Sequence, residues 1–275
     1  MIPNINPLDA RVRSVMGTGL LGLYVLLFVT FLLAPILIVV AVSFTPGQAL
    51  VFPYSGFSLR WYERAIEYRP FMTSLMTSLY LAAASAALAI LLAVPAALGL
   101  ARAQGRWANL LVAFLLSPLA IPPLVIGLSL LYYLSNIGIT RSFPSLLVAH
   151  TAVSVPYILR TVMAVFRNID THYAEASSVL GATRWQTFRH VTLPLIAPGI
   201  FAGALFAVLV SIDNLGVSYF FGTANVTTLP VVMLSYLQNQ FDPAIAAIST
   251  IQMAITLLLL FVIERRFGLK ALTTQ

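Results

Sequence analysis

Six long runs of apolar residues, separated by shorter polar connections, dominate the pattern along the chain. They cover residues 19–44, 71–101, 108–134, 144–166, 195–221 and 243–263. Each reaches the length of roughly 20 residues that an α-helix needs to cross the hydrocarbon core of a bilayer. The first run, at about 25 residues, also exceeds the apolar core of a cleavable signal peptide. The pattern therefore predicts an all-α membrane protein with six transmembrane helices, the first of them retained.

Composition supports a membrane protein and excludes an ordinary soluble domain. Apolar and aromatic residues make up 60% of the 275 residues and charged residues only 8%, whereas soluble domains carry about 25% charged residues. The net charge of +7 is typical of membrane proteins whose loops face anionic lipid, so we expect membrane lipid and no nucleic acid as a partner. Cysteine is absent, which excludes disulfides and thiolate metal sites.

The basic residues indicate which side of the membrane each connection faces. Most of them lie in the N-terminal tail, the 102–107 and 167–194 connections and the C-terminal tail. The opposite side holds Arg60, Arg64, Arg69 and Arg141, and Arg160 lies near the inner end of the fourth run. Because basic connections resist translocation, we expect both termini and the 167–194 connection to be cytoplasmic.

Two features interrupt the simple alternation of spans and loops. The outer connection 45–70 carries aromatic residues and alternating charges over 58–69, which favour a short helix at the lipid headgroups, with a solvated connector as the alternative. The third run contains Pro118, Pro122 and Pro123, which remove backbone donors and should break or kink the helix. Packing alone and a role in a transport path both explain such a break.

The 167–194 connection is the longest polar stretch on the basic side and predicts two short helices. The first is capped by Asp170 or Thr171 and ends at Gly181, because glycine suits the left-handed terminator of a helix. One face of this helix, at the spacing i, i+3, i+4, i+7, carries Tyr173, Ala176, Ser177 and Leu180.

The second predicted helix begins with a capping box formed by Thr183 and Gln186. We expect Pro194 to stop this helix. One side of it carries Trp185, Phe188 and Thr192. The connection is therefore predicted to form a helix-turn-helix parallel to the membrane that presents aromatic side chains to a partner; packing of an amphipathic loop under its own bundle is the alternative.

These residues resemble a known motif. The run Glu175-Ala-Ser-Ser-Val-Leu-Gly181, followed after nine residues by Val191-Thr-Leu-Pro194, is similar in all its spacings to the "EAA" loop of binding-protein-dependent ABC transporter permeases. Ser177 and Val191 depart conservatively from the Ala and Ile of that pattern. The resemblance extends over residues 72–264. The segments Ser211-Ile-Asp213 and Thr228-Leu-Pro230 are similar to the spermidine/putrescine branch.

The resemblance implies a type I ABC importer permease. It implies a five-helix core over 71–264 that contains the coupling loop 167–194, preceded by 1–70 and followed by a cytoplasmic tail at 265–275. Such a chain is a permease subunit that moves a small polar solute, such as a polyamine, across the bacterial inner membrane. The expected partners are a second permease subunit, in a heterodimer, two ATP-binding subunits and an extracytoplasmic substrate-binding protein.

The resemblance also assigns Glu175, Ala176 and Gly181 to the contact with the ATP-binding subunit. The exposed face of the predicted helices adds four residues to this contact: Tyr173, Ser177, Leu180 and Trp185. A rigid two-helix knob joined to the fourth and fifth spans can transmit a rigid-body movement of its partner into those spans.

Nothing in the sequence predicts an enzyme. The chain lacks the Gly-x-x-x-x-Gly-Lys-[Ser/Thr] phosphate loop, and its only lysine is Lys270. We expect no cofactor on this chain, and ATP and Mg²⁺ on the partner ATPase. His150, His172 and His190 are widely spaced and predict packing or solvated positions, since no His-Glu-x-x-His metal motif is present.

Asp213 is the one acidic residue inside a predicted span, and an ionisable group in that position is a functional candidate by default. In the polyamine-type branch it resembles a cation-handling position, although Asn214 stands where a second acid often follows. We predict a substrate path that includes Asp213, Asn214 and Tyr219. The alternative role of Asp213 is a hydrogen bond to a neighbouring helix or to the partner permease, and the alternative role of Tyr219 is in an interfacial aromatic belt.

Two further expectations depend on the fifth run. Gly199, Gly203 and Ala207 form a stripe of small residues that permits close helix approach. Asp213 also admits an alternative function, that of an ion-coupled secondary transporter or channel.

Overall fold

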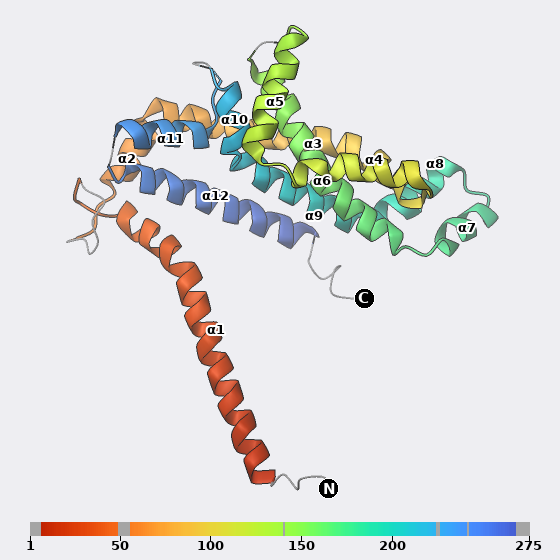
Figure 1. The fold of residues 1–275 in the computed structure, drawn as a ribbon, viewed down its shortest axis with the longest axis horizontal. Coiled ribbons are helices and arrows are strands. Elements are labelled where there is room, and N and C mark those ends of the chain that lie inside the picture. The colour runs from red at the N-terminus through yellow and green to blue at the C-terminus, as the bar shows by residue number, and fades with distance from the viewer. Residues whose placement is uncertain (1–6, 49–55, 140, 224–225, 241, 268–275) are drawn as a thin grey trace. The chain divides into compact units, whose positions relative to one another are not determined.

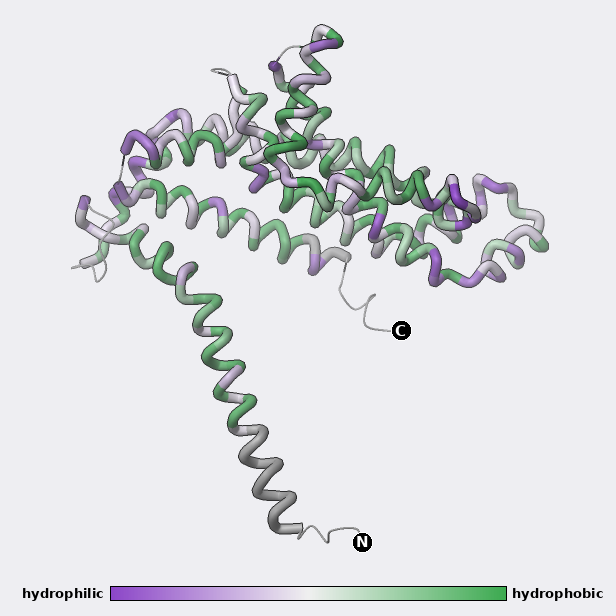
Figure 2. The backbone as a smooth tube through the Cα atoms, in the orientation of Figure 1, coloured by the Kyte–Doolittle hydropathy of each residue, from purple (hydrophilic) through white to green (hydrophobic). Residues whose placement is uncertain are grey.

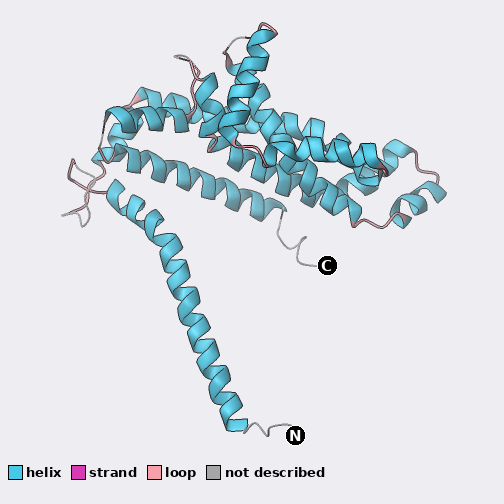
Figure 3. Ribbon diagram, viewed as in Figure 1, coloured by secondary structure: helices cyan, strands magenta, loops and turns pink. Residues whose placement is uncertain are grey.

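The computed structural model describes residues 7–48, 56–139, 141–223, 226–240 and 242–267, and these form helices joined by turns and loops, with no strand among them (Figure 3). The chain divides into two compact units, residues 1–65 with 241–250 and residues 66–240 with 251–275, and each is described by itself. The final helix, α12 (Ala244–Phe267), contributes to both.

Within the described residues, five helices are long and apolar enough to cross a membrane, or six when one bent pair counts as a single span. This confirms the predicted all-α membrane fold. The orientation of the termini and the division of the chain at residues 70 and 264 stay predictions.

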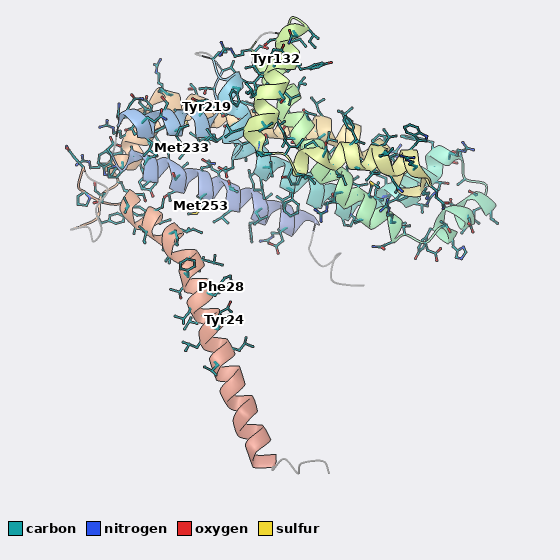
Figure 4. All side chains as sticks on the ribbon, viewed as in Figure 1. Tyr24, Phe28, Tyr132, Tyr219, Met233 and Met253 are labelled. Carbon is teal, nitrogen blue, oxygen red and sulfur yellow. The ribbon has the colours of Figure 1, made fainter. Side chains whose placement is uncertain are left out.

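The first unit contains α1 (Pro7–Ser43), whose span Gly19–Ser43 is almost wholly exposed to its surroundings. Most residues along this span are coloured as hydrophobic in Figure 2, and Tyr24 and Phe28 project from it in Figure 4. A helix that is apolar on all sides is stable when lipid surrounds it. The predicted first transmembrane helix is therefore present.

The short helix predicted within 58–69 is α2 (Arg60–Glu67). Trp61 is 2% exposed and donates its indole N–H to the Thr45 carbonyl over 2.9 Å. Arg60 lies over the Trp61 ring, 4.4 Å from its centroid, and Arg64 forms an ion pair with Asp242 at 3.4 Å. The location of α2 at the headgroups stays a prediction.

The second unit is built around three helices that run side by side in Figure 1: α3 (Arg69–Arg102), α6 (Phe143–Arg167) and α9 (Leu193–Ile212). Their shared core consists mainly of alanines from α3 and larger apolar side chains from α6, with Ile196 and Ala207 from α9. A Cβ added at Gly199 would lie 3.0 Å from the Thr161 carbonyl, and one at Gly203 would collide with Thr161. Ala207 is fully buried. The stripe of small residues therefore packs α9 closely against α6, as predicted.

The third predicted span is broken at its prolines. Helix α4 (Arg106–Leu116) continues into the 3₁₀ turn η1 (Ser117–Leu119), and α5 (Pro123–Asn136) departs from this pair at an angle of 108° (Figure 1). The predicted break is confirmed.

The fifth predicted span differs from the expectation of one helix over 195–221. Helix α9 ends at Ile212, and α10 (Leu215–Phe221) starts after Asp213 and Asn214. A further helix, α11 (Leu229–Asn239), follows in a stretch where no helix was expected. The apolar run hid the break because hydropathy does not report backbone direction.

Candidate functional site

The 167–194 connection forms α7 (His172–Val179) and α8 (Arg184–Thr187). Asp170 accepts the backbone N–H of His172 at its Oδ1 over 3.0 Å, whereas the Thr171 side chain makes no capping bond. Of the two predicted caps, Asp170 therefore supplies the acceptor. This bond satisfies a backbone donor that the first turn of a helix leaves without a partner.

Gly181 ends α7 with φ of 80°, a left-handed conformation that favours glycine. Its N–H donates to the Ser178 carbonyl, and the N–H of Ala182 donates to the Ser177 carbonyl, each over 3.0 Å. This pair of bonds is a Schellman motif. The predicted terminator is confirmed, and it fixes the direction in which the chain leaves α7.

The turn between the helices is held by side-chain bonds. Thr183 and Gln186 form the predicted capping box: Gln186 Oε1 accepts the Thr183 N–H over 2.7 Å, and Thr183 Oγ1 accepts the Gln186 N–H over 3.3 Å. Ser177 donates to the Ala174 carbonyl over 2.8 Å and accepts a bond from Thr187 Oγ1 over 2.8 Å. The two helices therefore form one tied hairpin.

The second helix does not stop at Pro194. Residues Phe188–Thr192 form a π-helical turn, η2, that joins α8 to α9, and Pro194 lies in the first turn of α9. Proline removes one backbone donor from a helix, and the π-helical turn before it shifts the hydrogen bonds from i→i+4 to i→i+5. The prediction that Pro194 ends the helix is wrong, and the hairpin is continuous with the long helix that follows.

Large apolar side chains cover the outside of this hairpin. Val179 and Leu180 are each 87% exposed, Trp185 65% and Tyr173 58%. Trp185 packs against Phe188, with 5.4 Å between their ring centroids. Val179 was missed because it lies off the i, i+3, i+4, i+7 face that the periodicity selects. Exposed apolar residues of this kind fit the predicted partner surface, and that role stays a prediction.

The remaining predicted coupling residues differ in exposure. Ala176 and Glu175 are exposed, whereas Ser177 is half-buried against Thr187. Glu175 Oε2 lies 3.1 Å from His172 Nδ1. The hydrogen bond to Glu175, followed by the charges of Asp170 and Glu175, raises the pKa of His172 above its ordinary value.

The three predicted path residues lie at or near the break between α9 and α10. Asp213 and Tyr219 are exposed, and Figure 4 shows Tyr219 on α10. Asn214 is 7% exposed and accepts the Val217 N–H at its Oδ1 over 3.0 Å, so it caps α10. Asp213 lies at the end of a helix and not within one, which corrects its predicted position inside a span.

Among the described residues, none forms a hydrogen bond or ion pair with the Asp213 carboxylate. The alternative in which Asp213 bonds to a neighbouring helix of this chain is therefore not observed.

A buried histidine contacts both helices that flank this break. His150, on α6, is 1% exposed; its Nδ1 lies 2.8 Å from Ser211 Oγ and its Nε2 lies 3.0 Å from Ser218 Oγ. Ser85 donates to Ser211 over 3.3 Å. Sequence reasoning placed His150 in packing and missed its partners, because nothing in the spacing pairs residue 150 with 211 and 218.

Helix α10 also touches α5 through glycine. A Cβ added at Gly216 would lie 2.8 Å from Pro123 Cβ, and one at Gly127 would lie 2.9 Å from the Gly216 carbonyl oxygen. The two broken spans therefore meet at a close backbone contact. Glycine is needed on both sides of it.

Two open depressions lie on the second unit. One, of about 480 Å³, is lined by Ser135, Arg141, Gly222 and Thr223, and the other, of about 350 Å³, includes Tyr80 and Phe143 in its lining. Neither includes Asp213. Within the described residues, no three His, Asp or Glu side chains are placed to hold a metal ion.

Residues 89–268 match the model of the family described as "Binding-protein-dependent transport system inner membrane component". The chain belongs to this family. It is therefore a multi-pass membrane permease subunit of an ABC importer, and the expectation carried by the 175–194 motif is confirmed at this level.

Similar proteins in this permease family include transporters of different solutes. The chain is 32% identical to the putrescine transport system permease protein PotI of Escherichia coli K12, over 82% of this chain and 83% of that one. It is 29% identical to the spermidine/putrescine permease PotC of Haemophilus influenzae Rd, over 83% and 89%. It is 34% identical to the molybdenum permease ModB of Mycobacterium tuberculosis H37Rv, over 70% and 79%.

Solved structures support the type I importer permease fold. A bacterial ABC transporter involved in the import of the acidic polysaccharide alginate aligns with a TM-score of 0.68 at 16% identity, over 97% of this chain and 100% of that one. A complex of a bacterial alginate ABC transporter with the alginate pentasaccharide-bound periplasmic protein aligns at 0.70 and 16%, over 94% and 96%. At this identity the likeness concerns the fold.

Proposed function

We propose that this permease subunit carries a polyamine or a similar small organic cation across the bacterial inner membrane, driven by ATP hydrolysis on separate subunits. In this proposal the α7–α8 hairpin faces the cytoplasm and docks on an ATP-binding subunit. The complete importer contains a second permease subunit, two ATP-binding subunits and an extracytoplasmic binding protein.

The observation that carries the proposal is the exposed apolar surface on a rigidly tied hairpin. Burial of Val179, Leu180 and Trp185 against a partner surface is favourable. It lowers the free energy by about 1.5–3 kcal/mol for each large side chain that becomes fully buried. An uncharged apolar surface of this kind is suited to the core of a protein interface, such as a groove on a folded partner. The Schellman motif, the capping box and the Ser177–Thr187 bond hold the surface in one shape.

The site residues divide into two roles. We assign the contact with the ATP-binding subunit to Tyr173, Glu175, Ala176, Leu180, Gly181 and Trp185, with Val179 added. Ser177 supports this surface from inside through Thr187.

The exposed Asp213 carboxylate supports a cationic solute. Because it lacks a partner among the described residues, it attracts a protonated amine and repels an anion. PotI and PotC are named for putrescine and spermidine transport, whereas ModB is named for molybdenum transport. The carboxylate favours the first of these two substrate classes. Tyr219 is exposed on the helix that follows, and Asn214 caps that helix.

The coupling role is tested by Glu175→Lys in the assembled importer. The reversed charge sits next to His172 and inside the proposed interface, so we expect substrate-stimulated ATPase activity and uptake to fall at least tenfold. Glu264→Lys on α12 makes the same charge change outside the hairpin and should leave both near normal. Normal substrate-dependent turnover in Glu175→Lys would overturn the proposed docking role.

A further inference from the structure

His150 forms a polar bridge in the apolar interior of the second unit. Its two ring nitrogens contact Ser211, in the last turn of α9, and Ser218, in the middle of α10. His150, Ser211 and Ser218 are all 3% exposed or less. One side chain on α6 therefore binds both sides of the α9–α10 break.

The chemistry of imidazole suits this position. A neutral ring donates one hydrogen bond and accepts one, and a serine hydroxyl on each side can supply the complementary group in either tautomer. An apolar side chain of similar size would leave both buried hydroxyls without this partner, and each unsatisfied buried group is unfavourable. The bridge therefore fixes the separation between Ser211 and Ser218.

The segment between these serines needs such support. Helix α10 has seven residues, and helices this short are not stable without tertiary contacts. Besides the bond from His150 to Ser218, α10 has the Asn214 cap and the close contact with α5 at Gly216. Asp213 lies within the bridged segment, and Tyr219 directly follows Ser218.

We infer that His150 is a positioning residue that holds Ser211 and Ser218 at a fixed separation across the α9–α10 break, a function that we call the lock. By doing so it sets the place of Asp213 and Tyr219 in the transport path. The consequence for transport rests on the proposed function, in which Asp213 meets the cationic solute. The lock itself is independent of the solute, so it can be tested by itself.

This chain contains no cysteine, so thiol labelling of this subunit within the assembled importer tests the lock directly. Val217→Cys places a reporter on α10 at a position that is fully buried. Adding His150→Leu should raise its labelling rate by about tenfold, because the local opening that exposes it becomes easier. His150→Gln keeps a donor and an acceptor and should return the rate to within about threefold of the parent.

A second reporter separates a lock from general support of the fold. Val162→Cys lies fully buried in the α3–α6–α9 core, and its labelling rate should not change with His150→Leu. Ser218→Ala, which is milder, should raise labelling at position 217 in the same direction; Ser74→Ala, a buried serine bonded to Phe71 in its own helix, should not. Unchanged labelling at 217, or an equal rise at 162, would overturn the lock.

Uptake measurements separate this inference from the proposed function. We expect His150→Leu and Ser218→Ala to reduce putrescine uptake at least fivefold, with recovery in His150→Gln. Asp213→Asn should abolish uptake and leave labelling at 217 unchanged. If Asp213→Asn transports normally, the proposed role of Asp213 is wrong, and the labelling result still tests whether His150 holds the break. Normal uptake in His150→Leu together with faster labelling would refute the positioning role.

Discussion

His172 and Glu175 lie one turn apart on α7, and their contact gives the exposed hairpin a pH-dependent charge. The bond to Glu175 raises the pKa of His172. A raised pKa in the folded state means that the contact stabilises the first turn fully at pH below the unfolded-state pKa. This contribution is lost as pH rises through the higher folded-state value.

We therefore predict that NMR titration of His172 in the purified chain gives a pKa above that of an unstructured peptide. Glu175→Ala should lower it more than Asp170→Asn does, because the bond to Glu175 is the larger cause. Equal values in the peptide, the parent and both variants would show that the contact does not form in solution.

Single residues also show what sequence patterns could and could not predict. Gly181 and the Thr183–Gln186 pair behave as predicted, because caps depend on residues only a few positions apart. Ser177 was placed on the outer face by helical spacing, but its hydroxyl contacts Thr187 on the next helix. Contacts of that kind, like those of His150, depend on how separate helices pack and leave no local signal.

The broken helices α5 and α10 depend on each other through glycine. We predict that Gly216→Ala destabilises the chain by about 1–3 kcal/mol, the usual range for overpacking, because the new methyl group would meet the backbone and ring of Pro123. Thermal unfolding in detergent measures this change.

Gly99→Ala is the matched control. Gly99 lies within α3 and has open space at the Cβ position, so the change should stabilise the helix by up to about 1 kcal/mol. Equal effects of the two substitutions would show that the α5–α10 contact is looser than described.

At the level of elements, proline gave both a correct and a wrong prediction. Pro118, Pro122 and Pro123 mark the break of the third span, where successive prolines remove donors inside a helix. Pro194 was expected to end a helix, but the π-turn before it places it in the first turn of α9. The break at Asp213 contains no proline, and the apolar run on both sides concealed it.

At the scale of the whole molecule, hydropathy predicted the membrane-spanning helices and the motif at residues 175–194 predicted the family. Both signals lie in continuous stretches of sequence, so neither depends on how the helices pack. The energy source is a property of the assembly, and we predict that this chain does not supply it. In proteoliposomes that contain this chain alone, neither ATP nor a proton or sodium gradient should drive uptake of radiolabelled putrescine. Addition of the second permease, the ATP-binding subunits and the binding protein should restore ATP-dependent uptake.

This comparison also decides between an ATP-driven importer and an ion-coupled transporter that uses Asp213. The chain carries no phosphate loop, so in the alternative function transport by this chain alone depends on that exposed carboxylate. Proteoliposomes with Asp213→Asn distinguish specific transport from leakage, since leakage should not depend on this side chain. Gradient-driven uptake by the chain alone, lost in Asp213→Asn, would establish the ion-coupled mechanism in place of the ATP-driven one.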